Sequence, residues 1–250
     1  PVSFPRQTAV SVATMKAETQ AADQSDVTLD QVSMSPKRGT VYTSYTVDLL
    51  RQTTMDVESW VRDDLGKGIA ELIDYMALTS NGVAPNPGKG LFASPTGINT
   101  KAYVATDSTT KTQSVIGLET ECAIDNADTA SASLIATPEV RGMWKGTPWL
   151  GNSSGISIWQ GAGENQTVNG YKAFVSNQVP KTLGAGTNEH GVVFGDFSQL
   201  MIGFWDALEI IVDPYTKAKE AIYEITARQY YDIGLRHPKA FCVQTGVTIS

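Results

Sequence analysis

The sequence predicts an α+β protein with long extended elements, and three observations lead to this fold class. Apolar and polar residues alternate through much of residues 8–48, which is the two-residue period of β-strands. Apolar residues recur every three or four positions through residues 57–76, which is the period of a helix. Residues 221–233 alternate again and are rich in β-branched and aromatic side chains, so one long strand fits them better than a helix.

The N-terminal strands are predicted to form an arm that stands away from the body. Strand patterns at residues 10–14 and 27–45 flank residues 17–26, which are small, polar and acidic. Such a segment has no apolar side chains to anchor it in a core, so we predict a long hairpin whose tip projects. Because an isolated two-stranded ribbon is only marginally stable in water, something else must cover this arm.

The clearest helix follows the arm. Asp56 is a suitable N-cap, and Asn81-Gly82 supplies a left-handed stop. A helix of roughly 24 residues at ~1.5 Å per residue would be about 35 Å long. Residues 83–110, rich in Gly, Pro, Asn, Ser and Thr, predict a long loop with a short strand near residues 97–99.

The rest of the chain is predicted to hold two shorter helices and several strands. The helices are 112–124 and 138–143, the second opened by Pro138 at its first position. Residues 146–170 are rich in loop residues. Asp206 is predicted to turn a hairpin between two of the strands. The predicted strands are 133–136, 171–176, 192–194, 200–204, 208–212, 221–233 and 241–245.

Length and composition exclude several classes of protein. The 250 residues are 41% hydrophobic and 18% charged, which is enough apolar mass for one or two folded domains. A net charge of -7 argues against tight binding of a phosphate backbone, because such binding needs clustered Lys and Arg. No run of 18 apolar residues and no signal-peptide pattern occurs, so no membrane contact is predicted. The first residue is Pro1 and not Met. Two explanations remain open: a protease trimmed the chain, or the numbering starts at an internal residue of a longer protein.

A serine nucleophile is the one catalytic motif in the sequence, and its context disfavours it. Gly151 to Gly155 match G-x-S-x-G around Ser153, and His237 with an Asp would complete a triad. A nucleophile elbow needs an apolar strand before it and a helix after it. Pro148-Trp149 precede this motif and an alternating segment follows, so we predict a polar loop.

No cofactor, metal or catalytic residue is predicted. The glycine-rich segments GAGENQ (161–166) and GAGTNE (184–189) lack the third glycine of a dinucleotide-binding loop and read as loops. The two histidines, His190 and His237, are too few for a metal or acid–base centre. Cys122 and Cys242 lack metal-site spacing and are predicted to be small core residues. The adjacent carboxylates at 63 and 64 point about 100° apart on a helix and are predicted to be solvated.

Four stretches, in order along nearly the whole chain, resemble the mature part of tailed-bacteriophage major capsid proteins, which have the Hong Kong 97 capsid fold. VTLDQVSMSPKRGTVYTSYTVDLL (27–50) is similar to the returning strand of the family's arm, and DVESWVRDDLGKGIAELID (56–74) to its long spine helix. NGYKAFVSNQVP (169–180) is similar to the strand and turn that leave the axial domain. FGDFSQLMIGFWDALEIIVDPYT (194–216), with GLRHPKAFCV (234–243), is similar to the peripheral-domain sheet.

The resemblance implies a division of the chain into four parts. Residues 1–50 would be the N-terminal segment and extended hairpin arm, and 51–110 the spine helix with part of the peripheral domain. Residues 111–193 would be the axial domain, and 194–250 the peripheral-domain sheet with the C-terminal strand. The family starts with a scaffolding segment that is removed in maturation. Its absence from this sequence is what we expect of a mature subunit.

The resemblance also implies a function without catalysis. A subunit of this family would assemble with its own copies into pentamers and hexamers of an icosahedral head around double-stranded DNA. It would do so in the bacterial host cytoplasm and remain in the virion, in weak, non-specific contact with the DNA and beside portal, scaffold or decoration proteins. An encapsulin-type compartment and a gene transfer agent shell remain open as alternatives, and a hydrolase using Ser153 is the alternative from another class.

Charged residues are the candidates for contacts between subunits, through acidic residues of the arm tip and basic residues of a neighbour. An isopeptide crosslink between an arm Lys and a peripheral-domain Asn, as in one branch of the family, is not predicted. The arm offers Lys16 and Lys37, but the acceptor position aligns with Lys217 and not with Asn. The interface candidates are Glu18, Asp23, Asp26, Lys37, Arg38, Arg62, Arg228 and Arg236.

Overall fold

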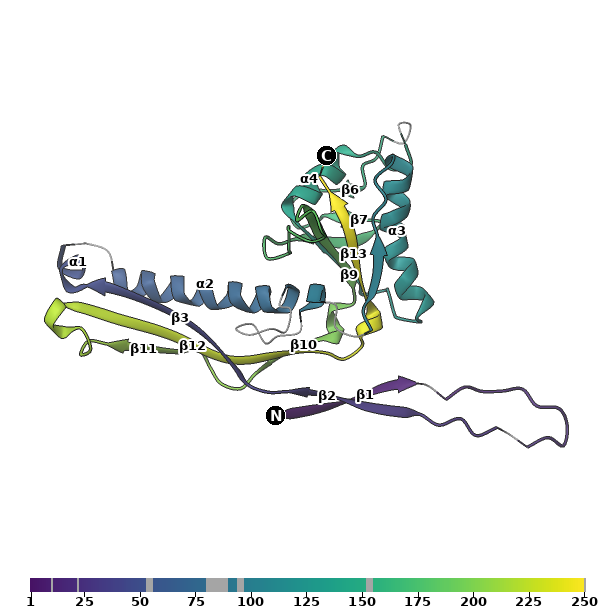
Figure 1. The fold of residues 1–250 in the computed structure, drawn as a ribbon, viewed down its shortest axis with the longest axis horizontal. Helices are drawn as coiled ribbons and strands as arrows, with labels where there is room; N and C mark the ends of the chain where they lie inside the picture. The colour runs from purple at the N-terminus through teal and green to yellow at the C-terminus, as the bar shows by residue number, and fades with distance from the viewer. Residues whose placement is uncertain are drawn as a thin grey trace.

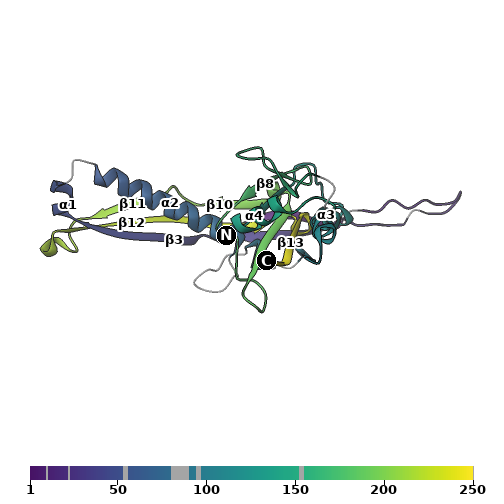
Figure 2. The ribbon, with the colours of Figure 1, turned by 90° about the horizontal axis from the view of Figure 1, so that it is seen from above.

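The computed structural model describes residues 1–9, 11–21, 23–52, 56–79, 90–93, 97–151 and 155–249. They form three parts (Figure 1): a two-stranded arm, a long layer in which one helix lies on a four-stranded sheet, and a compact body around a seven-stranded sheet. Seen from above, the long layer and the arm extend in opposite directions from the compact body (Figure 2). The structure thus combines helices and sheets, which is the α+β class that the sequence predicts.

The arm is a hairpin, as predicted, but one of its strands lies elsewhere. β1 (Val2–Ala9) pairs antiparallel with β2 (Thr28–Met34). The strand predicted at 10–14 is wrong, because residues 11–21 and 23–27 form no strand and make up the far loop. Cross-strand partners explain the difference. Phe4 lies opposite Val32, and the Arg6 Nη2 atom lies 2.5 Å from Asp30 Oδ2, so β1 pairs where it gains both contacts.

The long layer is organised around one strand, β12 (Ile222–Leu235), which the sequence predicts correctly. β3 (Lys37–Thr46) pairs with β12 along one edge. β10 (Leu200–Phe204) and β11 (Glu209–Asp213) both pair antiparallel with β12, so they run in the same direction along successive stretches of it.

The predicted hairpin at Asp206 is therefore wrong. The Trp205 amide still donates to the Tyr230 carbonyl at 3.1 Å, which continues the ladder beyond β10. The Asp206 carbonyl accepts a hydrogen bond from the Gln229 side chain. Residues 206–208 therefore interrupt the pairing with β12 between β10 and β11, and the chain does not reverse its direction there.

One face of this sheet is covered by α2 (Val57–Leu78), the predicted long helix. Asp56 caps it, since its side chain accepts from the Ser59 amide at 3.2 Å. The buried side chains of Leu65 and Ile69 pack with Tyr45, Ile225 and Ala227 of the sheet. The predicted stop at 81–82 lies outside the described residues. A short helix that the sequence pattern did not predict, α1 (Val47–Gln52), follows β3.

The compact body holds the second sheet, in the order β4-β13-β9-β5-β8-β7-β6, with helices α3 (Ser108–Ile124) and α4 (Pro138–Gly146). α3 begins before the predicted residue 112 because Asp107 forms a capping box with Thr110. The strands are β4 (Asn99–Ala102), β5 (Ser133–Ala136), β6 (Trp159–Gln160), β7 (Thr167–Val168), β8 (Tyr171–Val175), β9 (Glu189–Gly195) and β13 (Phe241–Thr248). Single-turn helices are η1 (Leu91–Ala93), η2 (Phe197–Gln199), η3 (Ala218–Glu220) and η4 (Pro238–Ala240).

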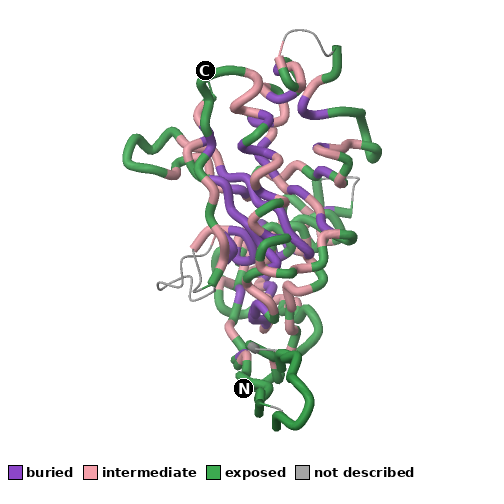
Figure 3. Tube along the Cα trace, turned by 90° about the vertical axis from the view of Figure 1, so that its right-hand side faces the viewer, coloured by how far each residue is buried: buried purple, intermediate pink, exposed green. Residues whose placement is uncertain are grey.

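Burial is concentrated in the compact body, whereas the part near the N-terminus is exposed (Figure 3). The C-terminal strand β13 pairs with β9 and β4, so the chain leaves this body after β9 and returns to it at the end. The range 194–250 thus contributes to both sheets. None of the helices in the described ranges is long and apolar enough to cross a membrane.

The two cysteines give the first testable prediction. Cys122 and Cys242 are buried core residues, as predicted, and burial raises the pKa of each thiol to about 12. Buried thiols with so high a pKa expose almost no thiolate at pH 8. We expect both to resist Ellman's reagent in the native chain and to react fully in guanidinium chloride. Rapid native labelling of either thiol would contradict this core packing.

Candidate subunit-interaction surfaces

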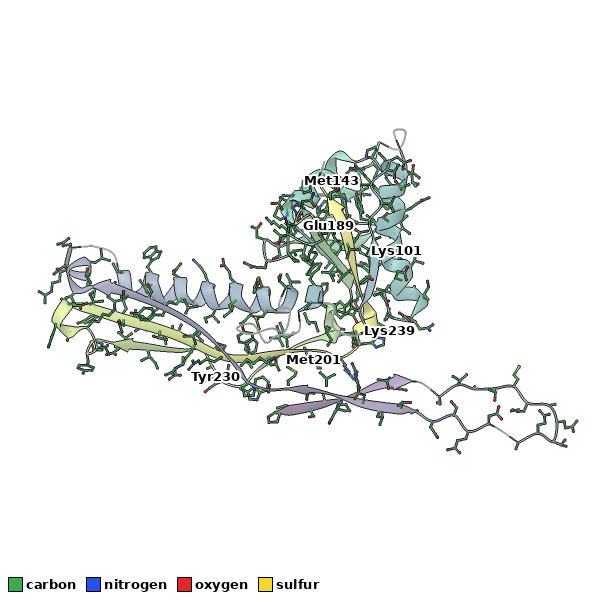
Figure 4. All side chains as sticks on the ribbon, viewed as in Figure 1. Lys101, Met143, Glu189, Met201, Tyr230 and Lys239 are labelled. Atoms are coloured by element: carbon green, nitrogen blue, oxygen red, sulfur yellow. The ribbon has the colours of Figure 1, made fainter. Side chains whose placement is uncertain are left out.

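Beyond its root, the described part of the arm is a surface without buried side chains. Met34, at its root, is the one buried residue among residues 1–8, 11–21 and 23–34. Figure 4 shows the arm's side chains standing clear of other elements over most of its length. Exposed apolar side chains occur along it: Val2, Phe4, Val12, Met15, Val27 and Leu29, of which Leu29 is 69% exposed. Side chains of this kind on a narrow ribbon are typical of an element that another molecule covers.

The three acidic interface candidates lie in the far loop of the arm. Asp23 forms an ion pair with Lys16 at 2.6 Å, so its charge is already matched within the loop. Asp26 accepts from the Gln24 amide group at 3.0 Å, and Glu18 is exposed. The loop lies far from the long layer (Figure 1), so the structure brings none of the three to a basic candidate of the same subunit.

Three of the five basic candidates are paired inside the subunit. Lys37 Nζ lies 2.9 Å from Asp232 Oδ1. Arg62 pairs with Glu58 one helical turn away, at 2.5 Å.

The third paired basic candidate, Arg228, joins the neighbouring strands β12 and β11. Arg228 Nε lies 2.8 Å from Glu209 Oε2. Arg38 and Arg236 are exposed. Their exposure leaves both arginines accessible to a neighbour's carboxylate, and an exposed ion pair of this kind would contribute only about 0–1 kcal/mol. The role of all eight charged candidates in contacts between subunits stays a prediction.

Sequence reasoning missed the exposed apolar side chains of the long layer. Trp60 on α2 is 66% exposed, Tyr215 after β11 is 84% exposed, and Phe204 of β10 is 57% exposed. A signal for Trp60 was present, since it lies outside the apolar stripe that Val57, Val61 and later residues form on the helix. A tryptophan on the polar face of a helix indicates a contact surface.

Lys217, which aligns with the crosslink acceptor position, is held in an ion pair. Its Nζ lies 2.7 Å from Glu224 Oε1, and the Tyr42 hydroxyl donates to the same oxygen at 2.5 Å. The hydrogen bond to Glu224 raises the pKa of Lys217, so this amine stays protonated. A lysine side chain carries no amide carbonyl for an arm Lys to attack, so the absence of a crosslink at this position stays a prediction.

Of the residues considered for catalysis, the structure describes the two histidines. Ser153 lies outside the described residues. His237 precedes η4, and its carbonyl accepts from the Ala240 amide at 3.1 Å. His190 Nδ1 lies 3.1 Å from the Thr137 hydroxyl, and burial lowers the pKa of His190. Within the described ranges no three metal-ligating side chains gather.

The predicted solvated and loop residues lie where expected. Residues 63 and 64 are exposed on α2. The segments 161–166 and 184–189 each contain a tight turn, closed by hydrogen bonds from Asn165 to Ala162 and from Thr187 to Gly184. These glycine-rich segments therefore serve as connections between strands.

The sequence matches the model of the phage capsid family over residues 1–246. It is 29% identical over 222 residues to the major capsid protein of Halomonas phage phiHAP-1, covering 89% of this chain and 34% of that protein. The chain therefore spans about a third of the length of this curated relative.

The fold is similar to the capsid of a native GTA particle, with a TM-score of 0.75 and 14% identity over 99% of this chain and 85% of that one. It is also similar to a structure of Mycobacterium phage Ogopogo, with a TM-score of 0.72 and 15% identity over 98% and 86% of the two chains. At these identities the structural matches establish the fold alone.

Proposed function

The chain belongs to the phage capsid family, and on this premise we propose that it is a major capsid subunit that assembles with its own copies into the pentamers and hexamers of an icosahedral head around double-stranded DNA. Its fold is the Hong Kong 97-type α+β fold expected from the resemblance. The observation that carries the proposal is the arm, an extended ribbon with exposed apolar side chains and one buried residue among those described.

Contacts between copies follow from this shape. A closed shell needs head-to-tail contacts in which one surface of a subunit meets a different surface of the next. The arm supplies one surface, and the exposed aromatic residues Trp60, Phe204 and Tyr215 of the long layer supply candidates for the other. We place the peripheral domain at the long layer of α2, β3 and β10 to β12, and the axial domain at the compact body, to which β13 contributes.

The charge of the subunit supports a container more than a nucleic-acid-binding protein. A net charge of -7 disfavours tight binding of phosphates, so packaged DNA would move freely against the wall. In this proposal the subunit assembles in the bacterial host cytoplasm, meets portal, scaffold or decoration proteins there, and remains in the virion. Catalysis plays no part in it, since members of the family serve as structural capsid proteins.

A gene transfer agent shell is the second candidate, favoured by the similarity to the GTA capsid. Electron microscopy of particles purified from producing cells tests both. We expect closed icosahedral cages that protect nucleic acid from nuclease, and sequencing of that nucleic acid separates a phage genome from host DNA. Cages that contain an enzyme would indicate an encapsulin-type compartment. A monomer at high concentration, with the arm folded on its own body, would contradict the proposal.

A further inference from the structure

The arm joins the long layer where two glycines of the sheet face its root. Met34 ends β2 and is 2% exposed, although the strand it ends is otherwise exposed or half-buried. It packs on the face of β10 and β12 that is opposite α2, where Figure 1 shows the root of the arm passing beneath these strands. Met201 and Tyr230, labelled in Figure 4, mark the nearby part of the layer.

The two glycines lie on the neighbouring strands β10 and β12, and both face the root of the arm. A Cβ atom on Gly234 would lie 2.9 Å from Val32 Cγ1 and 3.2 Å from Met34 Sδ. A Cβ atom on Gly203 would lie 2.8 Å from Met34 Cε. Neither glycine has a positive φ angle, so the backbone would accept alanine at both positions. What the glycines supply is therefore space for the root of the arm.

A buried carboxylate fixes the turn that follows. Asp232, whose side chain is 6% exposed, accepts from the Ser35 amide at 2.9 Å through Oδ2 and from Lys37 Nζ at 2.9 Å through Oδ1. These two partners lie on either side of Pro36, where the chain passes from the arm into β3. The carboxylate thus ties both sides of the turn to β12.

We propose that Gly203, Gly234 and Asp232 are positioning residues that form a seat for Met34 and set the direction of the arm in the free subunit. The inference rests on the proposed function, because it makes the arm ready for a second copy of the chain before that copy binds. A ribbon that pivoted freely would lose orientational freedom at each contact, and a ribbon held in one direction loses less.

The distance between two spin labels on the unassembled full-length chain tests the seat. Leu29→Cys on the exposed side of the arm and Thr120→Cys on α3 provide the labelling sites. The native cysteines are buried and stay unlabelled. We expect one narrow distance distribution for this labelled chain, measured by pulsed electron spin resonance at a concentration at which sedimentation shows no shells.

Gly234→Ala is expected to make this distribution about twofold wider or to shift its centre, because the added methyl group meets the branched Val32 side chain. Gly203→Ala should act more weakly, since it meets the flexible end of Met34. Gly66→Ala in α2 is the matched control, because nothing lies within 4 Å of its Cβ position. Asp232→Asn keeps the size of the side chain, removes the charge that pairs with Lys37, and should also widen the distribution.

Narrow, unshifted distributions in both Gly234→Ala and Asp232→Asn would overturn the seat. Circular dichroism checks that each variant is folded, and if Gly234→Ala is not, Asp232→Asn and Met34→Ala decide alone. Shell formation is measured separately by electron microscopy. Shells without any effect of the seat variants would refute the seat and leave the proposed function intact. If the seat variants change the distance distribution but the unchanged chain never forms shells, the seat stands and the proposed function is refuted.

Discussion

A chain whose arm is shortened to a tight hairpin folds as the full-length chain does but forms no closed shells. This is the result we expect when residues 10–27 are replaced by Asn-Gly, which closes a two-residue hairpin between the paired Ala9 and Thr28. Residues 11–21 and 23–27 contain no buried side chain, so the replacement removes little that stabilises the subunit. It does remove the part of the arm that reaches farthest from the body.

Sedimentation and electron microscopy measure shell formation, and thermal unfolding by circular dichroism measures stability. A matched control keeps the loop length and neutralises its charges with Lys16→Gln, Glu18→Gln, Asp23→Asn and Asp26→Asn. If charge at the tip drives the contact, this neutral arm also fails to assemble. If the exposed apolar residues Val12 and Met15 drive it, the neutral arm assembles. Normal shells from the shortened chain would contradict the role of the arm.

The elements that the sequence predicts well are those that local pattern alone determines. α2 begins at the residue after the predicted cap because Asp56 and the apolar stripe specify the same start. β5 and β12 follow from short runs of apolar or alternating residues. In each case the information lies within one element and needs no knowledge of its neighbours.

Strand partners could not be predicted in the same way. The patterns at 200–204 and 208–212 indicate two strands, but they do not state whether these pair with each other or with a third. Both strands pair with β12 and not with each other, because β12 provides a partner residue for every position of β10 and β11. The position of β1 was likewise decided by its contacts with β2.

Contacts between segments that are far apart in the sequence were the least predictable part. Lys37 and Asp232 are far apart in the sequence, and only the folded chain brings them together at the turn into β3. Gly203 and Gly234 would be taken in the sequence as residues that weaken strands. Their use as space for Met34 depends on packing between the arm and the sheet.

Trp144→Ala is expected to lower the free energy of unfolding by about 3–5 kcal/mol, the range for deleting a large buried aromatic side chain. Trp144 is fully buried in α4, its ring lies 6.2 Å from that of Trp159, and its Nε1 atom donates to the Tyr103 hydroxyl at 3.2 Å. The substitution leaves a cavity and deprives Tyr103 of a partner. In a chain of this size the midpoint of thermal unfolding should fall by on the order of 10 °C.

Trp60→Ala is the matched substitution on the surface, and it should produce the opposite pattern. Trp60 is 66% exposed, so its removal should change the stability of the isolated subunit by only about 0.5 kcal/mol or less. A tryptophan that a second copy buries contributes strongly to association, so shells of this variant should need a higher subunit concentration to form. An equal loss of thermal stability in Trp144→Ala and Trp60→Ala would contradict the buried position of Trp144 and the exposed position of Trp60. Unchanged assembly of Trp60→Ala would exclude this side chain from the contacts between subunits, because truncating an exposed indole that no second copy covers removes no contact between copies.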